Sequence, residues 1–248
     1  MKRFVFWLVR LGIRPFMSSG VPLWLQRYWS RLVSMALIGP RHANQTSDLV
    51  AGIETLRIEP ANRQSGRGVL FLHGGGYVSC DASSHEKLAA WVGHAAQARV
   101  WLPEYRLAPE YPYPTAIHDA LAVYETLLDA GQDPEQLVIA GDSAGGGLTL
   151  ATAIAIRDSG LPLPAALVLY SPWADLSLSG NSIRTHASRD AMIKLSWIRW
   201  CADQYRGAVP ANDPGCSPLF ADLSGLPPIL VHVGTEEILL SDSERLVE

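Results

Sequence analysis

The sequence is poor in cysteine. Its 248 residues include only three, Cys80, Cys201 and Cys216, and these are scattered along the chain. Three isolated cysteines cannot form the disulfide framework of a small secreted scaffold, and no pair has the spacing of a structural metal site. We interpret all three as free thiols, and we expect neither a metal ion nor a cofactor.

The sequence also lacks a long apolar run and a strong excess of positive charge. No uninterrupted apolar stretch approaches the roughly 20 residues of a membrane-spanning helix. The first apolar stretch is broken by Arg10 and has no obvious small-residue cleavage site, so a cytoplasmic location is expected, although the sequence leaves secretion open. A net charge of −4 gives no reason to expect nucleic acid as a partner.

Acidic residues are absent from the first 47 positions, which hold seven of the twenty basic residues. The remaining thirteen basic and 24 acidic residues give the rest of the chain a net charge of −11. Apolar residues at helical spacing predict two amphipathic helices, one on each side of the segment 15–22. Two interpretations stay open for this pair: a lid that closes over an apolar substrate pocket, or a basic segment in weak contact with an anionic membrane surface.

Short apolar runs alternate with helical segments after Pro60. Continuous hydrophobicity, rather than strict alternation, is typical of strands that are buried on both faces. The sequence therefore predicts an α/β fold with a mostly parallel central sheet flanked by helices. Two capping boxes are expected to begin helices, Ser83 with Glu86 and Ser241 with Glu244. The five predicted strands are residues 69–72, 100–102, 137–140, 167–170 and 229–233.

The segment 141–145, with the sequence GDSAG, follows the third of these runs and precedes an alanine-rich helix. A strand that turns sharply into a helix needs small residues on both sides of the serine, because the strained turn packs against its neighbours. Such a turn lifts the hydroxyl of Ser143 above the sheet edge, where the start of the helix favours a developing negative charge. The pattern indicates a nucleophile elbow, although five residues alone also fit a tight turn without chemistry.

A second glycine-rich segment, 73–77 with the sequence HGGGY, follows the first predicted strand. Consecutive glycines allow a loop to bring its backbone N–H groups close to a reacting carbonyl. A phosphate-binding loop is rejected, because no lysine, serine or threonine follows at the required spacing. With the N–H of Ala144, this loop is expected to form an oxyanion hole, and His73 is interpreted as structural.

The two motifs together resemble the hormone-sensitive-lipase-like branch of the α/β-hydrolase superfamily. The segments 105–110 (YRLAPE), 171–173 (SPW) and 217–219 (SPL) strengthen this resemblance, which runs from about residue 50 to the last residue. It implies an α/β-hydrolase fold with N-terminal cap helices over residues 1–47 and a catalytic domain over residues 48–248. The activity implied is hydrolysis of small carboxylic esters with short to medium acyl chains, without a metal or cofactor.

The resemblance also implies roles for individual residues. Ser143 attacks the ester carbonyl, and the N–H groups of Gly74, Gly75 and Ala144 hold the oxyanion. A carboxylate is expected after the strand 229–233, two residues before a leucine. That position is Glu237, with the neighbouring residue Glu236 as the second choice.

The catalytic histidine that the resemblance implies is not found. In the family it lies in a loop roughly 30 residues beyond the acid, whereas here 11 residues follow Glu237 and none is histidine. Of the seven histidines, His186 is the best-placed substitute, but we expect the base, with a last strand and helix, in a continuation beyond Glu248. The chain alone is then expected to be inactive. The alternative is a pseudoenzyme that lacks the triad and binds a small ligand, and the oligomeric state is left open.

Overall fold

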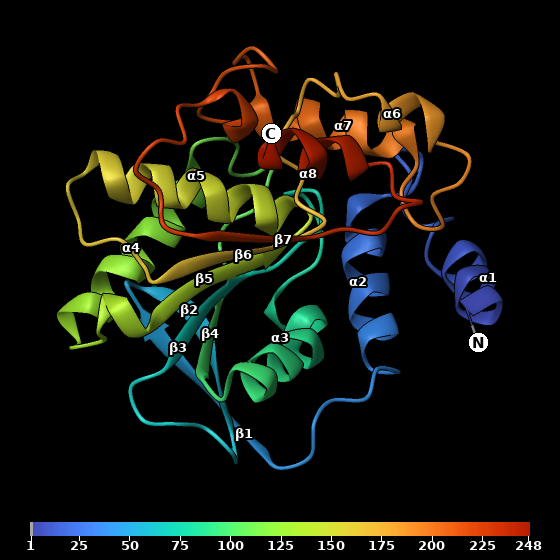
Figure 1. The fold of residues 1–248 in the computed structure, drawn as a ribbon. Helices are drawn as coiled ribbons and strands as arrows, with labels where there is room; N and C mark the ends of the chain where they lie inside the picture. Colours follow the sequence, from blue (N-terminus) through green and yellow to red (C-terminus); the bar gives the residue numbers. More distant parts are fainter. Residues whose placement is uncertain (1) are drawn as a thin grey trace.

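The computed structural model describes residues 2–248, which form one seven-stranded sheet with helices on both faces (Figure 1). The strand order is β1-β2-β4-β3-β5-β6-β7, and all pairs from β4 to β7 are parallel. The α/β fold with a mostly parallel sheet is thereby confirmed. The strands are β1 Ala43–Val50, β2 Ile53–Pro60, β3 Gly68–Leu72, β4 Arg99–Pro103, β5 Leu137–Asp142, β6 Ala166–Tyr170 and β7 Ile229–His232.

Five of these strands coincide with the apolar runs found in the sequence. The reason is visible in β3, where all five residues are buried because helices cover both sides of the sheet. Leu70 and Leu72 belong to the core on one side, and Val69 and Phe71 to the core on the other. Continuous hydrophobicity is therefore required at this strand.

The antiparallel hairpin of β1 and β2 is not anticipated by the sequence analysis. Six of the eight residues of β1 are exposed, so its sequence is polar and carries no apolar signal. β2 adds to the sheet by pairing antiparallel with β4. β1 begins at Ala43 and continues through residue 47, the predicted end of the N-terminal cap. The division into a cap over residues 1–47 and a catalytic domain over residues 48–248 stays a prediction.

Helices cover both faces of the sheet. α3 packs against β2 and β4 on one face, and α5 packs against β3, β5 and β6 on the other, with α4 beside it (Figure 1). None of the helices within residues 2–248 has both the length and the apolarity to cross a membrane. The helices are α1 Lys2–Gly12, α2 Leu23–Ser34, α3 Ala82–Ala96, α4 Thr115–Asp129, α5 Ala144–Asp158, α6 Ser182–Thr185, α7 Leu195–Arg206 and α8 Leu240–Val247.

Both predicted capping boxes are wrong. α3 is capped by Asp81, whose Oδ1 accepts the N–H of Ser84 at 2.8 Å while the Ser84 hydroxyl accepts the N–H of Asp81. Ser83 lies inside the first turn and donates its hydroxyl to the same carboxylate. α8 begins after Leu239, which makes no side-chain capping bond. A carboxylate two residues earlier displaces the serine from the cap of α3, because it accepts more hydrogen bonds there.

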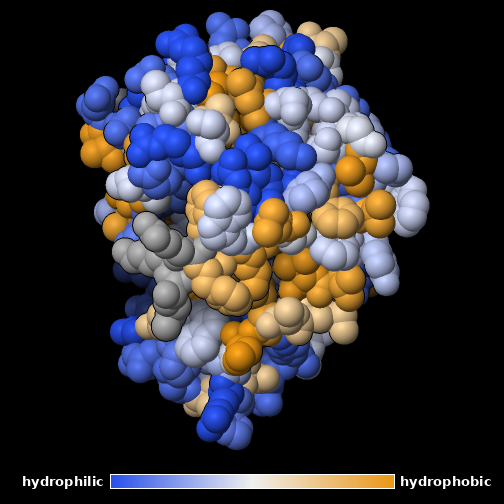
Figure 2. Space-filling view, turned by 90° about the vertical axis from the view of Figure 1, so that its right-hand side faces the viewer, coloured by the Kyte–Doolittle hydropathy of each residue, from blue (hydrophilic) through white to orange (hydrophobic). Residues whose placement is uncertain are grey.

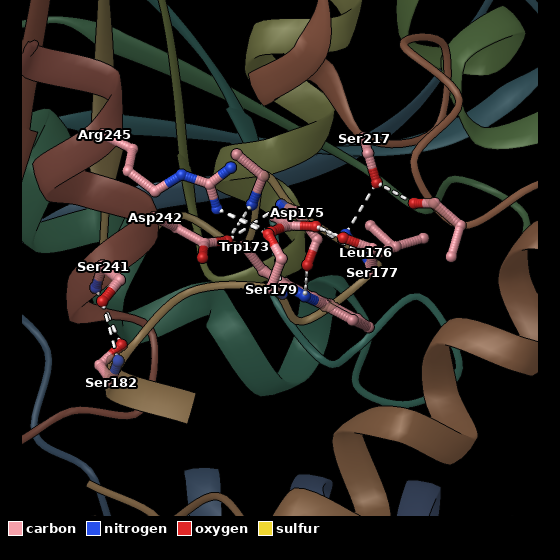
Figure 3. A network of polar contacts seen from close by, with 12 residues as sticks. Trp173, Asp175, Leu176, Ser177, Ser179, Ser182, Ser217, Ser241, Asp242 and Arg245 are labelled. Atoms are coloured by element: carbon pink, nitrogen blue, oxygen red, sulfur yellow. Dashed lines mark hydrogen bonds and ion pairs between the residues drawn. The ribbon is translucent and has the colours of Figure 1, made fainter. Parts of the chain in front are cut away.

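A buried polar network attaches α8 to the segment that follows β6 (Figure 3). The Oδ2 atom of Asp242 accepts the backbone N–H groups of Ala174 and Asp175, each at 2.9 Å. The fully buried carboxylate of Asp175 pairs with Arg245 of α8 at 2.8 Å. Burial, together with the nearby charge of Asp175, raises the pKa of Asp242 to about 7. Asp242 thus joins α8 to the segment after β6, although burial disfavours the ionised form of its carboxyl group.

Replacing Asp242 with asparagine is expected to change how stability depends on pH. Between about pH 4 and pH 7 the unfolded carboxyl ionises and the folded one does not, so the stability of the native chain falls as the pH rises. An asparagine side chain at this position would keep an acceptor for the two N–H groups and does not ionise. We expect Asp242→Asn to gain up to about 4 kcal/mol relative to the native chain between pH 4 and pH 8 in urea unfolding. An equal difference at both pH values would contradict this assignment.

Candidate active site

Ser143 lies at the sharp junction of β5 and α5. Its φ of 53° and ψ of −119° are strained for a residue with a side chain. The backbone of Ser143 is fixed on both sides, because its N–H donates to Tyr170 O and its carbonyl accepts the N–H of Trp173, each at 2.8 Å. The strain is therefore held by the neighbouring strand β6 and the loop after it.

The glycines of the 141–145 segment are required by this junction. A Cβ atom on Gly141 would lie 2.3 Å from the carbonyl oxygen of Gly145, and one on Gly145 would lie 2.0 Å from the carbonyl oxygen of Leu72. Both obstacles are backbone atoms, one in the first turn of α5 and one at the end of β3, which cannot easily move. The small residues around the serine are therefore explained by the close approach of β3, β5 and α5.

The 73–77 loop lies next to the elbow and is bonded to it. The N–H of Gly74 donates to Oδ1 of Asp142 at 2.9 Å, so this N–H is already paired in this structure, and the role expected for Gly74 stays a prediction. Within residues 2–248, the N–H groups of Gly75, Gly76 and Ala144 make no hydrogen bond. Free donors on both the loop and the start of α5 are what an oxyanion hole requires.

Asp142 has a second partner that the sequence analysis misses. Nε2 of His85, on α3, lies 3.3 Å from Oδ2 of Asp142. Burial opposes the charged form of His85, but the Asp142 carboxylate outweighs it and raises the pKa of the histidine. His85 thereby stabilises the carboxylate that positions Gly74. No pattern of spacing connects His85 with residue 142, since the contact joins two different elements.

His73 is placed behind the loop, as its structural interpretation requires. Its ring is completely buried and stacks on Tyr105 with the ring centres 4.2 Å apart. Nδ1 lies 2.8 Å from the carbonyl oxygen of Gly74. Burial, followed by the nearby His85, lowers the pKa of His73 to about 4, so the ring is neutral at pH 7. His73 supports the loop and makes no hydrogen bond with Ser143.

The two glutamates after β7 have different environments. Glu237 is half-buried, and its Oε1 accepts the N–H of Gly234 at 2.8 Å. Glu236 is exposed and pairs with Arg189 at 2.6 Å. The loop is fixed by Asp190, whose Oδ2 accepts the N–H of Ile238 at 2.9 Å. Because β5, β6 and β7 are parallel neighbours, this loop and Ser143 both lie at the carboxyl ends of the strands.

No histidine of residues 2–248 makes a hydrogen bond with the Ser143 hydroxyl. His85 contacts Asp142, and His186 contacts the Thr185 hydroxyl at 2.8 Å. In the same part of the chain, no group of three or more histidine, cysteine, aspartate or glutamate residues is arranged to hold a metal ion. Two surface cavities of about 250 and 550 Å³ lie near the amino ends of the parallel strands, and none of the residues around Ser143 lines them.

Comparison with known proteins agrees with this geometry. Residues 69–248 match the family described as alpha/beta hydrolase fold. The chain belongs to this family. It is 44% identical over 189 residues to an acetyl-hydrolase of Streptomyces hygroscopicus, a match that covers 76% of this chain and 63% of the relative. The chain thus spans somewhat less than two thirds of the length of the curated relatives that it matches.

Solved structures place the chain in the hormone-sensitive-lipase-like branch. A hormone-sensitive lipase from a metagenome library superposes with a TM-score of 0.94 at 35% identity, covering 100% of this chain and 82% of that one. An esterase/lipase from an uncultured bacterium superposes with a TM-score of 0.92 at 39% identity, covering 98% and 81%. The α/β-hydrolase fold and the branch expected from the two glycine motifs are thereby confirmed.

Proposed function

We propose that the protein hydrolyses small carboxylic esters through an acyl-enzyme on Ser143. The observation that carries this proposal is the strained serine at the elbow beside unbonded N–H groups of Gly75, Gly76 and Ala144. Names of relatives support the same class, since they include an acetyl-hydrolase and an esterase. Esters with short to medium acyl chains remain the expected substrates.

The reaction follows from the positions of these groups. Ser143 Oγ forms a bond with the ester carbonyl carbon as a base takes its proton, and the carbonyl oxygen becomes an oxyanion between the free N–H groups. Collapse of this intermediate breaks the bond to the alcohol, which leaves with the proton. Water then attacks the acyl-enzyme in the same way and releases the carboxylic acid.

No side chain of the described residues 2–248 that could act as the base makes a hydrogen bond with the Ser143 hydroxyl. A positioned general base contributes roughly 10²–10⁴-fold to such a reaction. We therefore expect the purified 248-residue chain to hydrolyse p-nitrophenyl butyrate slowly, and added imidazole to raise the rate by at least about tenfold above the imidazole background. Rapid hydrolysis without imidazole would contradict the inactivity that we propose for this chain.

Glu237, rather than Glu236, is proposed as the acid that orients the base. In the imidazole-dependent reaction its carboxylate would stabilise the imidazolium, so we expect Glu237→Gln to lower the rate about fivefold. Glu236→Gln is the matched control, because it neutralises the adjacent, exposed carboxylate, and it is expected to change the rate by less than about twofold. The reverse order of the two effects would assign the role to Glu236.

A ligand-binding pseudoenzyme is the second candidate, and the absence of a histidine contact to Ser143 within residues 2–248 favours it. The two functions differ in one readout. Saturable binding of a non-hydrolysable ester analogue, without any imidazole-dependent hydrolysis, would support the pseudoenzyme. Hydrolysis that depends on Ser143 would support the esterase.

A further inference from the structure

The exposed face of α1 is apolar. Phe4, Trp7, Leu8 and Leu11 follow one stripe of the helix and are all exposed, Trp7 to 53% and Leu11 to 69%. A surface helix normally directs such a stripe toward the core and its charged residues toward water. In α1 this apolar stripe faces outward instead, and no other helix or strand of the described residues covers it.

Arg10 of α1 and Arg14 of the segment after it point toward the protein instead. Arg10 donates to the carbonyl oxygen of Ser188 at 3.1 Å, and Arg14 donates to that of Ala187 at 3.2 Å. Neither arginine pairs with a carboxylate among residues 2–248, so no nearby negative side chain offsets their charge. They attach the helix to the body and add charge beside its apolar stripe.

The second helix has the same inverted arrangement. Its fully buried residues are the polar Gln26 and Ser34, whereas Trp24, Tyr28 and Leu32, at intervals of four, are exposed, Trp24 to 69%. The two helices are joined, since Nε1 of Trp29 donates to the carbonyl oxygen of Gly12, the last residue of α1, at 2.9 Å. Figure 2 shows apolar side chains gathered across the middle of the face that carries α1. We define the outer helical face as Phe4, Trp7, Leu8, Leu11, Trp24, Tyr28 and Leu32.

We propose that the outer helical face docks the protein onto a bilayer of anionic phospholipid. Large aromatic and aliphatic side chains flanked by basic ones are the composition of helices that lie in a membrane interface. The first 47 residues carry seven basic residues and no acidic one, whereas the rest of the chain is negative. Arg27 and Arg31 pair with Glu110 and Asp81, and the remaining basic charge complements an anionic surface and orients the molecule with its negative part away from it.

Docking in this orientation brings the proposed active site near the bilayer. The inner side of α2 is bonded to the segments around the 73–77 loop, because Arg27 donates to the carbonyl oxygen of Val78 at 2.9 Å. Trp197 of α7 donates to Oε1 of Gln26 at 2.8 Å, and its ring would meet a Cβ atom placed on Gly76. The inner face of α2 thus packs beside the 73–77 loop, and the outer helical face is free to contact lipid. The interpretation as a lid therefore applies to the inner face of α2, and the interpretation as a membrane-contacting segment applies to the outer helical face.

The test is co-sedimentation of the 248-residue chain with phosphatidylcholine vesicles that contain or lack phosphatidylglycerol. Binding is expected only with phosphatidylglycerol, and it should weaken as salt is raised. Trp7→Ser combined with Leu11→Ser is expected to lower the partition coefficient at least about tenfold. Leu49→Ser is the matched control, since Leu49 is 76% exposed on β1, outside the helices, and it should bind like the native chain.

The outcomes separate this proposal from its competitors. No binding to either vesicle, or equal binding to both, would overturn it. Self-association in light scattering that is lost in the double variant, without vesicle binding, would overturn it too and assign the face to a second copy of the chain. Ser143→Ala is expected to bind vesicles like the native chain, so the result does not depend on the proposed esterase activity.

Discussion

Replacing Ser143 with alanine is expected to remove all protein-catalysed hydrolysis of p-nitrophenyl butyrate in the presence of imidazole. Only the rate that imidazole gives in buffer without protein should remain. The alanine variant keeps the oxyanion donors but has no atom that can form the acyl-enzyme. Since imidazole alone also cleaves this ester, the comparison is made at equal imidazole concentration. Release of p-nitrophenolate, followed by absorbance, measures the difference.

The control for this variant is Ser159→Ala. Ser159 lies at the other end of α5 and is exposed, so its removal leaves the elbow unchanged. Its rate is expected to equal that of the native chain within about twofold. If Ser143→Ala retained the imidazole-dependent rate, the nucleophile would have to be another group, and the proposed mechanism would be wrong.

Replacing Gly145 with alanine is expected to destabilise the fold by at least about 3 kcal/mol. The new Cβ atom would meet the carbonyl oxygens of Leu72 and His73 at 2.0 and 2.6 Å, and both belong to the backbone at the end of β3. Relief of this overlap requires α5 to move away from the sheet, which also moves Ala144 and Ser143. We expect a melting temperature lower by about 10 °C, together with loss of the imidazole-dependent activity.

Gly12→Ala is the matched control for added volume. Nothing lies within 4 Å of a Cβ atom placed on Gly12, at the end of α1. Its stability is expected to change by less than about 0.5 kcal/mol in thermal unfolding. Equal melting temperatures for the Gly145 and Gly12 variants would show that the contacts at the elbow are looser than the structure describes.

The inner parallel strands β3, β4 and β5 could be predicted because burial on both faces forces their sequences to be apolar, whereas three of the four residues of β7, at the edge of the sheet, are exposed. The elbow could be predicted for a related reason, since only glycine fits at positions 141 and 145. Both are local patterns with a single physical cause. The hairpin of β1 and β2 has no such pattern, because an exposed strand accepts nearly any polar residue.

Contacts between distant elements account for most of what the sequence could not provide. The bond from Gly74 to Asp142 and the contact of His85 with the same carboxylate each depend on where the helix α3 and the loop meet β5. The sequence shows two amphipathic helices near the N-terminus, but their periodicity does not reveal which face is buried. Only the placement of Gln26 inside and Trp24 outside shows that an apolar face of α2 is turned outward. The roles of Gly75, Ala144 and Glu237 stay predictions.

The central claim, that Ser143 is an activated nucleophile, is tested most directly by mass spectrometry after treatment with a fluorophosphonate in the presence of imidazole. The expected result is one phosphonyl group for each chain, located on the peptide that contains Ser143 and absent from the Ser143→Ala variant. Modification of a different residue, or none at all in the folded native chain, would contradict the claim.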